Sequence, residues 1–262
     1  MPTTRRSGVR IFYRALGDGP PTVLVHGYTG SGWSNWLASG WAEALSGERR
    51  LIIPDLRGHG RSQKPWRTEA YSLDALASDV LAAMDVSGVE KAPIFGYSMG
   101  AMVALSLLLN HPGRFNAAII GGMGSSFPRG PGRVSLQTHP PPSHANRRPP
   151  GSQSSRRSAL DRARFIAGYA AQADPIALDR VFRGVFRGNP PVDVSRLGTI
   201  TVPVLVAAGT ADVFFAPATD LARRIPGARF VPLPNEGHIS AVRNPKFMAA
   251  VREFLATHSS AP

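Results

Sequence analysis

The sequence predicts an α/β protein with a mostly parallel sheet that is flanked by helices on both faces. Short β-rich runs alternate with helical stretches along most of the chain, and several of these runs, such as 22–25 and 204–207, are apolar throughout. Apolar strands of this kind are typical of parallel sheets covered by helices, and an alternating order of strands and helices builds such sheets.

The apolar patterns predict seven strands and five helices of the main fold. Ser72 is a favourable N-cap, Pro112 is expected to end the preceding helix, and Asn244 stands before a proline at a first helical position. The expected strands are 9–16, 22–25, 50–53, 92–95, 116–120, 202–207 and 229–233, and the expected helices are 33–45, 73–84, 99–109, 217–224 and 245–257.

The alternation breaks from about residue 125 to residue 158. Proline, serine, glycine and arginine dominate there, and six arginines without one acid contribute +6 to the net charge of +13. Such a composition cannot bury enough apolar surface to offset the entropy of ordering. Two interpretations stay open: a disordered loop, or a local out-of-frame translation of an arginine-codon-rich gene.

Helical periodicity returns at 160–173 and 175–186, which predicts two lid helices. We therefore expect a core formed by residues 1–123 and 196–262, with a cap inserted at 124–195.

Composition excludes several classes of protein. The absence of cysteine excludes disulfides, thiolate metal sites and a cysteine nucleophile. No apolar run reaches the roughly 20 residues of a membrane helix, and no signal-peptide core precedes the first strand, so we expect a cytoplasmic protein without a membrane span. The arginines lack interleaved aromatic residues, which argues against specific nucleic-acid binding. Without a metal-ligand cluster or a dinucleotide fingerprint, we expect neither a metal nor a cofactor.

A nucleophile is indicated at Ser98. The only match to the pattern G-x-S-x-G spans residues 96–100, between an apolar strand and an apolar helix. A sharp strand-to-helix turn exposes the serine Oγ at the edge of the sheet, and the flanking glycines avoid collisions of β-carbons. The start of the helix also directs backbone N–H groups toward a developing oxyanion.

A serine nucleophile needs a base, and the base needs an acid that fixes its tautomer. His238 follows the last predicted strand and Asp212 follows the strand before it, so both are expected at the same edge of the sheet as Ser98. Asp55 also ends a strand but precedes the nucleophile, and we interpret it as structural. The other histidines lie in turns, at a helix end, in the tail or in the aperiodic stretch: His26, His59, His111, His139, His144 and His258.

A glycine-containing loop after the strand at 22–25 predicts the oxyanion hole. We expect the backbone N–H of Tyr28 to face that of Met99, and two such donors would each contribute about a hundred- to a thousandfold in rate. An apolar acyl pocket is expected from side chains that follow strands or belong to the cap: Trp33, Met123, Phe182, Phe214 and Phe215.

These motifs, in this order, resemble the α/β-hydrolase superfamily over nearly the whole chain outside 125–158. The markers are His26-Gly27, the turn at 55–62, the nucleophile motif at 96–100, the strand that leads to Asp212, and Gly237-His238. The resemblance implies an eight-stranded, mostly parallel sheet, a small helical cap after the sixth strand, and an acyl-enzyme mechanism.

Within that superfamily the residues favour a serine esterase that acts on small-molecule carboxylic esters of modest size. Serine replaces the aspartate nucleophile of epoxide hydrolases and haloalkane dehalogenases, and the His-Gly-Tyr-Thr-Gly segment differs from the His-Gly-Gly-Gly loops of some lipases and esterases. Other activities share the same triad: cofactor-free perhydrolase or haloperoxidase, carbon–carbon bond hydrolase and aminopeptidase. A catalytically silent fold used for binding is a further alternative.

Overall fold

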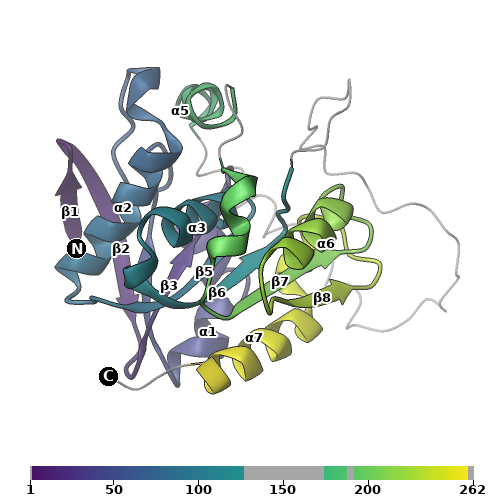
Figure 1. The fold of residues 1–262 in the computed structure, drawn as a ribbon. Helices are drawn as coiled ribbons and strands as arrows, with labels where there is room; N and C mark the ends of the chain where they lie inside the picture. The colour runs from purple at the N-terminus through teal and green to yellow at the C-terminus, as the bar shows by residue number, and fades with distance from the viewer. Residues whose placement is uncertain (1, 127–173, 188–191, 259–262) are drawn as a thin grey trace, which may run out of the picture.

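The computed structural model describes residues 2–126, 174–187 and 192–258. Their strands form one sheet of eight strands in the order β1-β2-β4-β3-β5-β6-β7-β8 (Figure 1). β2 pairs antiparallel with β1 and β4, whereas the other neighbours are parallel. This confirms the predicted eight-stranded, mostly parallel sheet. The strands are β1 (Thr3–Arg6), β2 (Val9–Leu16), β3 (Pro21–Val25), β4 (Arg50–Pro54), β5 (Ala92–Tyr97), β6 (Phe115–Gly121), β7 (Val204–Gly209) and β8 (Arg229–Leu233).

Helices cover both faces of the sheet (Figure 1). The α-helices are α1 (Trp41–Ser46), α2 (Leu73–Val86), α3 (Met99–Asn110), α5 (Pro175–Val181), α6 (Phe215–Arg224) and α7 (Pro245–His258). Short π- and 3₁₀-helical turns are η1 (Trp33–Leu37), η2 (Thr68–Ala70), η3 (Pro112–Arg114), η4 (Phe182–Phe186), η5 (Val194–Thr199) and η6 (Ser240–Arg243).

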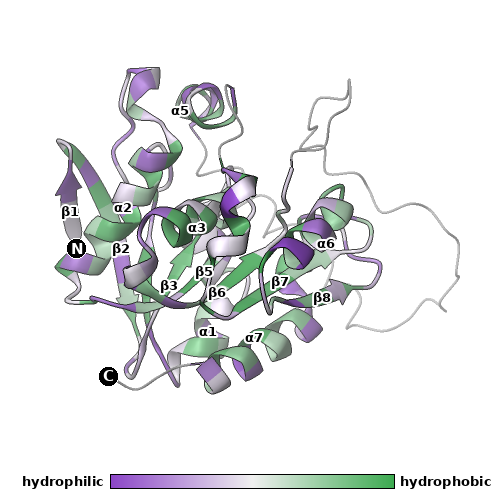
Figure 2. Ribbon diagram, in the orientation of Figure 1, coloured by the Kyte–Doolittle hydropathy of each residue, from purple (hydrophilic) through white to green (hydrophobic). Residues whose placement is uncertain are grey.

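Two apolar clusters hold these layers together. One joins the sheet to α2, α3 and α6, and the other joins its opposite face to α1 and α7. Strands β5 and β7 are buried along their whole length, and β7 is hydrophobic in Figure 2. Burial on both faces explains why these strands are continuously apolar in the sequence.

Two elements differ from the sequence predictions. β1 was not predicted, because Thr-Thr-Arg-Arg has no apolar alternation; it is a mostly exposed edge strand whose arginines discourage pairing with another chain. The single helix expected at 33–45 is divided into η1 and α1. Gly40 lies between them with φ of 94°, a left-handed conformation that a continuous helix cannot contain.

The expected helix at 175–186 is present as α5 followed by η4, within the connection between β6 and β7. This segment packs closely on the core, because a β-carbon on Gly184 would lie 1.9 Å from the carbonyl oxygen of Tyr71. Val181 and Val185 are buried in the same contact region. The helix expected at 160–173 and most of the aperiodic stretch lie outside the described residues.

Within the described ranges, no helix combines the length and the apolar character needed to cross a membrane. The same part of the chain contains no group of three His, Asp or Glu side chains placed to hold a metal ion.

Candidate active site

Ser98 occupies the turn between β5 and α3. Its backbone has φ of 56° and ψ of −119°, which is rare for a residue other than glycine. Such strained conformations persist only where the surrounding structure enforces them, and they cluster at active sites.

Close backbone packing enforces this turn. A β-carbon on Gly96 would lie 2.2 Å from the carbonyl oxygen of Gly100, and one on Gly100 would lie 2.1 Å from that of Val25. Both distances are too short for any side chain. The two glycines of the motif are therefore required where α3 folds back across β3 and β5.

The structure brings Ser98, His238 and Asp212 into one hydrogen-bonded chain. His238 Nε2 lies 2.9 Å from Ser98 Oγ, and His238 Nδ1 lies 2.9 Å from Asp212 Oδ2. A carboxylate can only accept, so Nδ1 carries the proton and Nε2 is free to accept the Ser98 hydroxyl proton. The Asp212 side chain is fully buried, whereas that of His238 is 23% exposed.

Neighbouring groups hold the acid and the imidazole in place. The backbone N–H of Phe214 donates to Asp212 Oδ1 at 3.0 Å, and the Phe214 ring lies 5.3 Å from the His238 ring. The Tyr97 hydroxyl donates to the main-chain oxygen of His238 at 2.6 Å. Sequence reasoning missed Tyr97, although it stands inside the nucleophile motif.

The loop after β3 lies directly against Ser98. A β-carbon on Gly27, the residue before Tyr28, would be 3.3 Å from Ser98 Cβ. Met99 is the first residue of α3, where backbone N–H groups have no partner within the helix. The structure thus places the loop that contains Tyr28 and the first turn of α3 on Ser98.

The five expected pocket residues separate into different environments. The Phe182 ring lies 6.3 Å from the ring of Tyr28, in the loop after β3. Phe214 lies beside His238, so both phenylalanines are near the candidate site. Phe215, the first residue of α6, instead packs on Phe230 of β8. Met123 is buried in the core, and Trp33 is 36% exposed on η1.

Phe186 was not predicted, yet its ring lies 5.4 Å from that of Tyr28. It follows Phe182 by one helical turn on η4. The spacing of four residues was the available signal for a shared face.

Asp55 has the structural role expected of it. Its two carboxylate oxygens accept from the backbone N–H groups of Gly32 at 2.7 Å and Arg61 at 2.8 Å. Arg14 lies 3.6 Å from the same carboxylate. These bonds fix the turn after β4 against the loop after β3.

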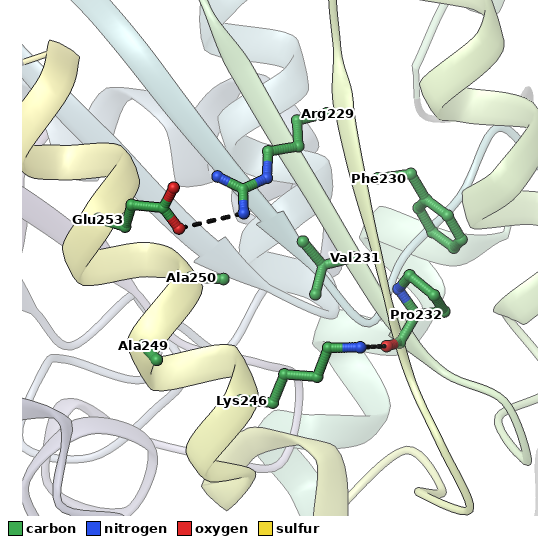
Figure 3. Close-up of a pocket in the computed structure, with 8 residues that line it drawn as sticks. All are labelled: Arg229, Phe230, Val231, Pro232, Lys246, Ala249, Ala250 and Glu253. Carbon is green, nitrogen blue, oxygen red and sulfur yellow. Dashed lines mark hydrogen bonds and ion pairs between the residues drawn. The ribbon is translucent and has the colours of Figure 1, made fainter.

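A shallow groove of about 320 Å³ lies elsewhere, between β8 and α7 (Figure 3). Lys246 Nζ donates to the Pro232 carbonyl there at 3.1 Å, and Arg229 pairs with Glu253 at 3.1 Å. None of the eight lining residues belongs to the hydrogen-bonded chain at Ser98. This groove is therefore separate from the candidate active site.

A family model described as alpha/beta hydrolase fold matches residues 20–163, more than half of the 262 residues. The chain belongs to the alpha/beta hydrolase fold family. A Bacillus subtilis protein provisionally named 2-succinyl-6-hydroxy-2,4-cyclohexadiene-1-carboxylate synthase is 28% identical over 97% of both chains. The 2-hydroxymuconate semialdehyde hydrolase of Pseudomonas sp. strain CF600 is 32% identical over 47% of this chain and 43% of its own length.

Solved structures of this alpha/beta hydrolase family are similar over nearly the whole chain. Est816, described as an N-acyl homoserine lactone degrading enzyme, is 27% identical with a TM-score of 0.72 over 97% of this chain and 100% of its own. A thermophilic esterase from Thermogutta terrifontis is 25% identical with a TM-score of 0.71 over 98% and 97%.

Proposed function

We propose that this chain is a serine hydrolase that cleaves carboxylic esters of modest size. The observation that carries the proposal is the hydrogen-bonded chain from Ser98 through His238 to Asp212, with both distances at 2.9 Å. In this proposal Ser98 is the nucleophile, His238 the general base and Asp212 the group that orients the imidazole.

The reaction proceeds through an acyl-enzyme. His238 Nε2 takes the proton as Ser98 Oγ attacks the ester carbonyl, and the resulting imidazolium protonates the departing alkoxide. Water then attacks the acyl-enzyme carbonyl, and His238 again accepts and returns one proton. The acid is released and Ser98 regains its hydrogen, so the cycle uses only groups of the chain and one water.

The oxyanion is held by backbone N–H groups of Tyr28 and Met99. Gly27 lies against Ser98, and Met99 opens α3, which supports this assignment. Fixed donors of this kind stabilise charge that exists only in the transition state, and each contributes roughly 10²- to 10³-fold.

Aromatic side chains favour an apolar acyl group beside this site. Phe214 lies next to His238, and Phe182 lies next to Tyr28. Similarity to an esterase and to a lactone-degrading enzyme also supports ester substrates, with lactones as a cyclic subclass.

The test is hydrolysis of p-nitrophenyl esters from acetate to decanoate by the wild type and Ser98→Ala. Ser106→Ala is the matched control, because Ser106 is a buried serine on the same helix, away from the turn. We expect activity that disappears only in Ser98→Ala, together with fluorophosphonate labelling of Ser98. Equal turnover by all three proteins would rule the proposal out.

A carbon–carbon bond hydrolase is the second candidate, because the Pseudomonas 2-hydroxymuconate semialdehyde hydrolase is 32% identical over 126 residues. The same triad would serve this reaction. Assay of a vinylogous 1,5-diketone dienoate beside the esters decides between them. A kcat/KM for the dienoate that exceeds that for every ester would favour the second candidate.

A further inference from the structure

Two buried histidines that the proposed reaction does not use contact main-chain carbonyl oxygens around Tyr28. His26 Nδ1 lies 2.8 Å from the Gly27 carbonyl oxygen, and His59 Nε2 contacts the carbonyl oxygen of Tyr28 itself. The side chains are almost completely inaccessible, and their rings meet edge to face with centroids 5.0 Å apart.

His26 fixes the peptide group that contains the Tyr28 N–H. The backbone N–H of Leu56 donates to His26 Nε2 at 3.0 Å, so the ring proton is on Nδ1 and is donated to Gly27. In a planar trans peptide the carbonyl and the N–H point in opposite directions. Holding the Gly27 oxygen therefore aims the Tyr28 N–H away from His26.

His59 acts on the next peptide group and comes from a different part of the chain. It lies in the turn after β4, 31 residues from Tyr28, and its other nitrogen lies 3.0 Å from the Arg57 carbonyl oxygen. Burial, reinforced by the neighbouring His26, lowers the pKa of His59 to about 3. The ring is therefore neutral near pH 7 and carries one proton, which it can donate either to the Tyr28 carbonyl oxygen or to the Arg57 carbonyl oxygen but not to both.

We propose that His59 is a positioning residue of the oxyanion hole, donating from Nε2 to the Tyr28 carbonyl. With His26 on the preceding peptide, both peptide planes around the Tyr28 Cα are held, so the N–H that receives the oxyanion is fixed before substrate binds. The backbone N–H of Gly27, which donates to Asn35 Oδ1 at 3.1 Å, anchors the start of the same loop. This inference rests on the proposed ester hydrolysis.

Preorganised donors stabilise the transition state because they need no reorientation as charge develops. A loosened donor weakens transition-state binding while leaving ground-state binding nearly unchanged. Loss of the His59 bond should therefore lower kcat and leave KM close to its original value.

The variants His59→Leu and His59→Gln test this role. Leucine fills a similar volume without a donor, whereas the glutamine Nε2 reaches near the position of the imidazole Nε2 and can donate to Tyr28. His111→Leu is the control, because His111 is exposed at the end of α3. The measurements are kcat and KM per fluorophosphonate-titrated site, and inhibition by an alkyl trifluoromethyl ketone, whose adduct with Ser98 carries an oxyanion.

We expect His59→Leu to lower kcat roughly ten- to a hundredfold, with KM changed less than about threefold and ketone affinity lowered in parallel with kcat. His59→Gln should recover most of both losses. An unchanged kcat per titrated site in His59→Leu would overturn the proposal even if that variant melts at a lower temperature. Wild-type protein without ester turnover would overturn the proposed function instead, and this inference with it.

Discussion

The Tyr97 hydroxyl donates a 2.6 Å hydrogen bond to the main-chain oxygen of His238, across 141 residues of sequence. Tyr97 is the last residue of β5, so this bond joins the strand that presents Ser98 to the loop that presents the base. Gly121 and Gly122 make room for the ring, since β-carbons there would lie 2.6 Å and 2.8 Å from it. The separation between Ser98 and His238 is therefore set partly by Tyr97, which lies outside the proposed triad.

Tyr97→Phe should lower kcat/KM about fivefold, because one buried hydrogen bond contributes about 1 kcal/mol and the His238 loop gains freedom without it. The ring contacts remain, so the protein should stay folded. Tyr13→Phe is the control, as Tyr13 is a buried tyrosine on β2. Identical rates of fluorophosphonate labelling and ester turnover in wild type and Tyr97→Phe would contradict this role.

Asp212→Asn should reduce kcat roughly 10⁴-fold, because an amide can donate to Nδ1 and so favour the wrong tautomer of His238. Asp220→Asn is the comparison, since Asp220 is a partly exposed residue of α6 that pairs with Arg224. Kinetics with the best p-nitrophenyl ester measure both. A loss of less than tenfold in Asp212→Asn would point to another acid.

The arrangement of the proposed triad could be predicted from sequence because each member follows a strand, and the carboxyl ends of parallel strands meet at one edge of the sheet. The apolar patterns identified strands β5, β7 and β8. Ser98, Asp212 and His238 follow these strands in that order, and their side chains are hydrogen-bonded to one another in the structure. Strand β1 could not be predicted, because its exposed sequence Thr-Thr-Arg-Arg has no alternation of apolar and polar residues.

The supporting residues could not be predicted in the same way. Tyr97 and His59 act by donating to main-chain carbonyls that lie 141 and 31 residues away. A carbonyl is present at every position, so no pattern of side chains marks the partner. The break in the helix at Gly40 could not be predicted either. Its left-handed φ of 94° is a property of the backbone, and the surrounding side chains keep an apolar helical pattern.

The protein should lose stability as pH falls from about 6.5 toward 5. Burial lowers the pKa of His26 to about 4 and that of His59 to about 3. Below pH 6.5 the unfolded chain therefore binds protons that the folded chain rejects, and stability decreases until the folded pKa values are reached. By pH 5 this amounts to about 2 kcal/mol for each histidine.

Urea unfolding at pH 7.5, 6.0 and 5.0 measures this loss, and the range stays above the usual pKa of carboxylates. His26→Asn retains a donor near the Nδ1 position and removes one titrating group, so its stability should fall less steeply. His111→Asn is the matched variant at an exposed position. The same slope in His26→Asn and in the wild type would contradict a buried neutral His26.

The buried ion pair between Arg57 and Asp79 should be essential for stability. Arg57 Nη2 lies 2.6 Å from Asp79 Oδ1, and the two side chains are 4% and 0% exposed. Asp79→Ala leaves a buried guanidinium without its carboxylate, which should lower the free energy of unfolding by about 3–5 kcal/mol. Asp85→Ala, at an exposed pair with Arg114, should cost less than about 1 kcal/mol. Similar urea midpoints for the two variants would refute the expectation.

Tyr28 also connects the loop after β3 to the insertion formed by α5 and η4. Its hydroxyl donates to the Leu178 carbonyl of α5 at 2.7 Å, and its ring packs near Phe182 and Phe186. Tyr28→Phe removes only the hydroxyl bond, while the tight packing of Gly184 on Tyr71 keeps the insertion docked.

Because this variant loosens α5 without removing the ring, we expect it to accept longer acyl chains more readily. The ratio of kcat/KM for decanoate to that for acetate should rise about five- to tenfold, the scale of one hydrogen bond. Tyr13→Phe again serves as the control. A uniform fall in kcat/KM across the whole ester series would instead mean that the Tyr28 hydroxyl supports the oxyanion N–H and does not limit the size of the acyl group.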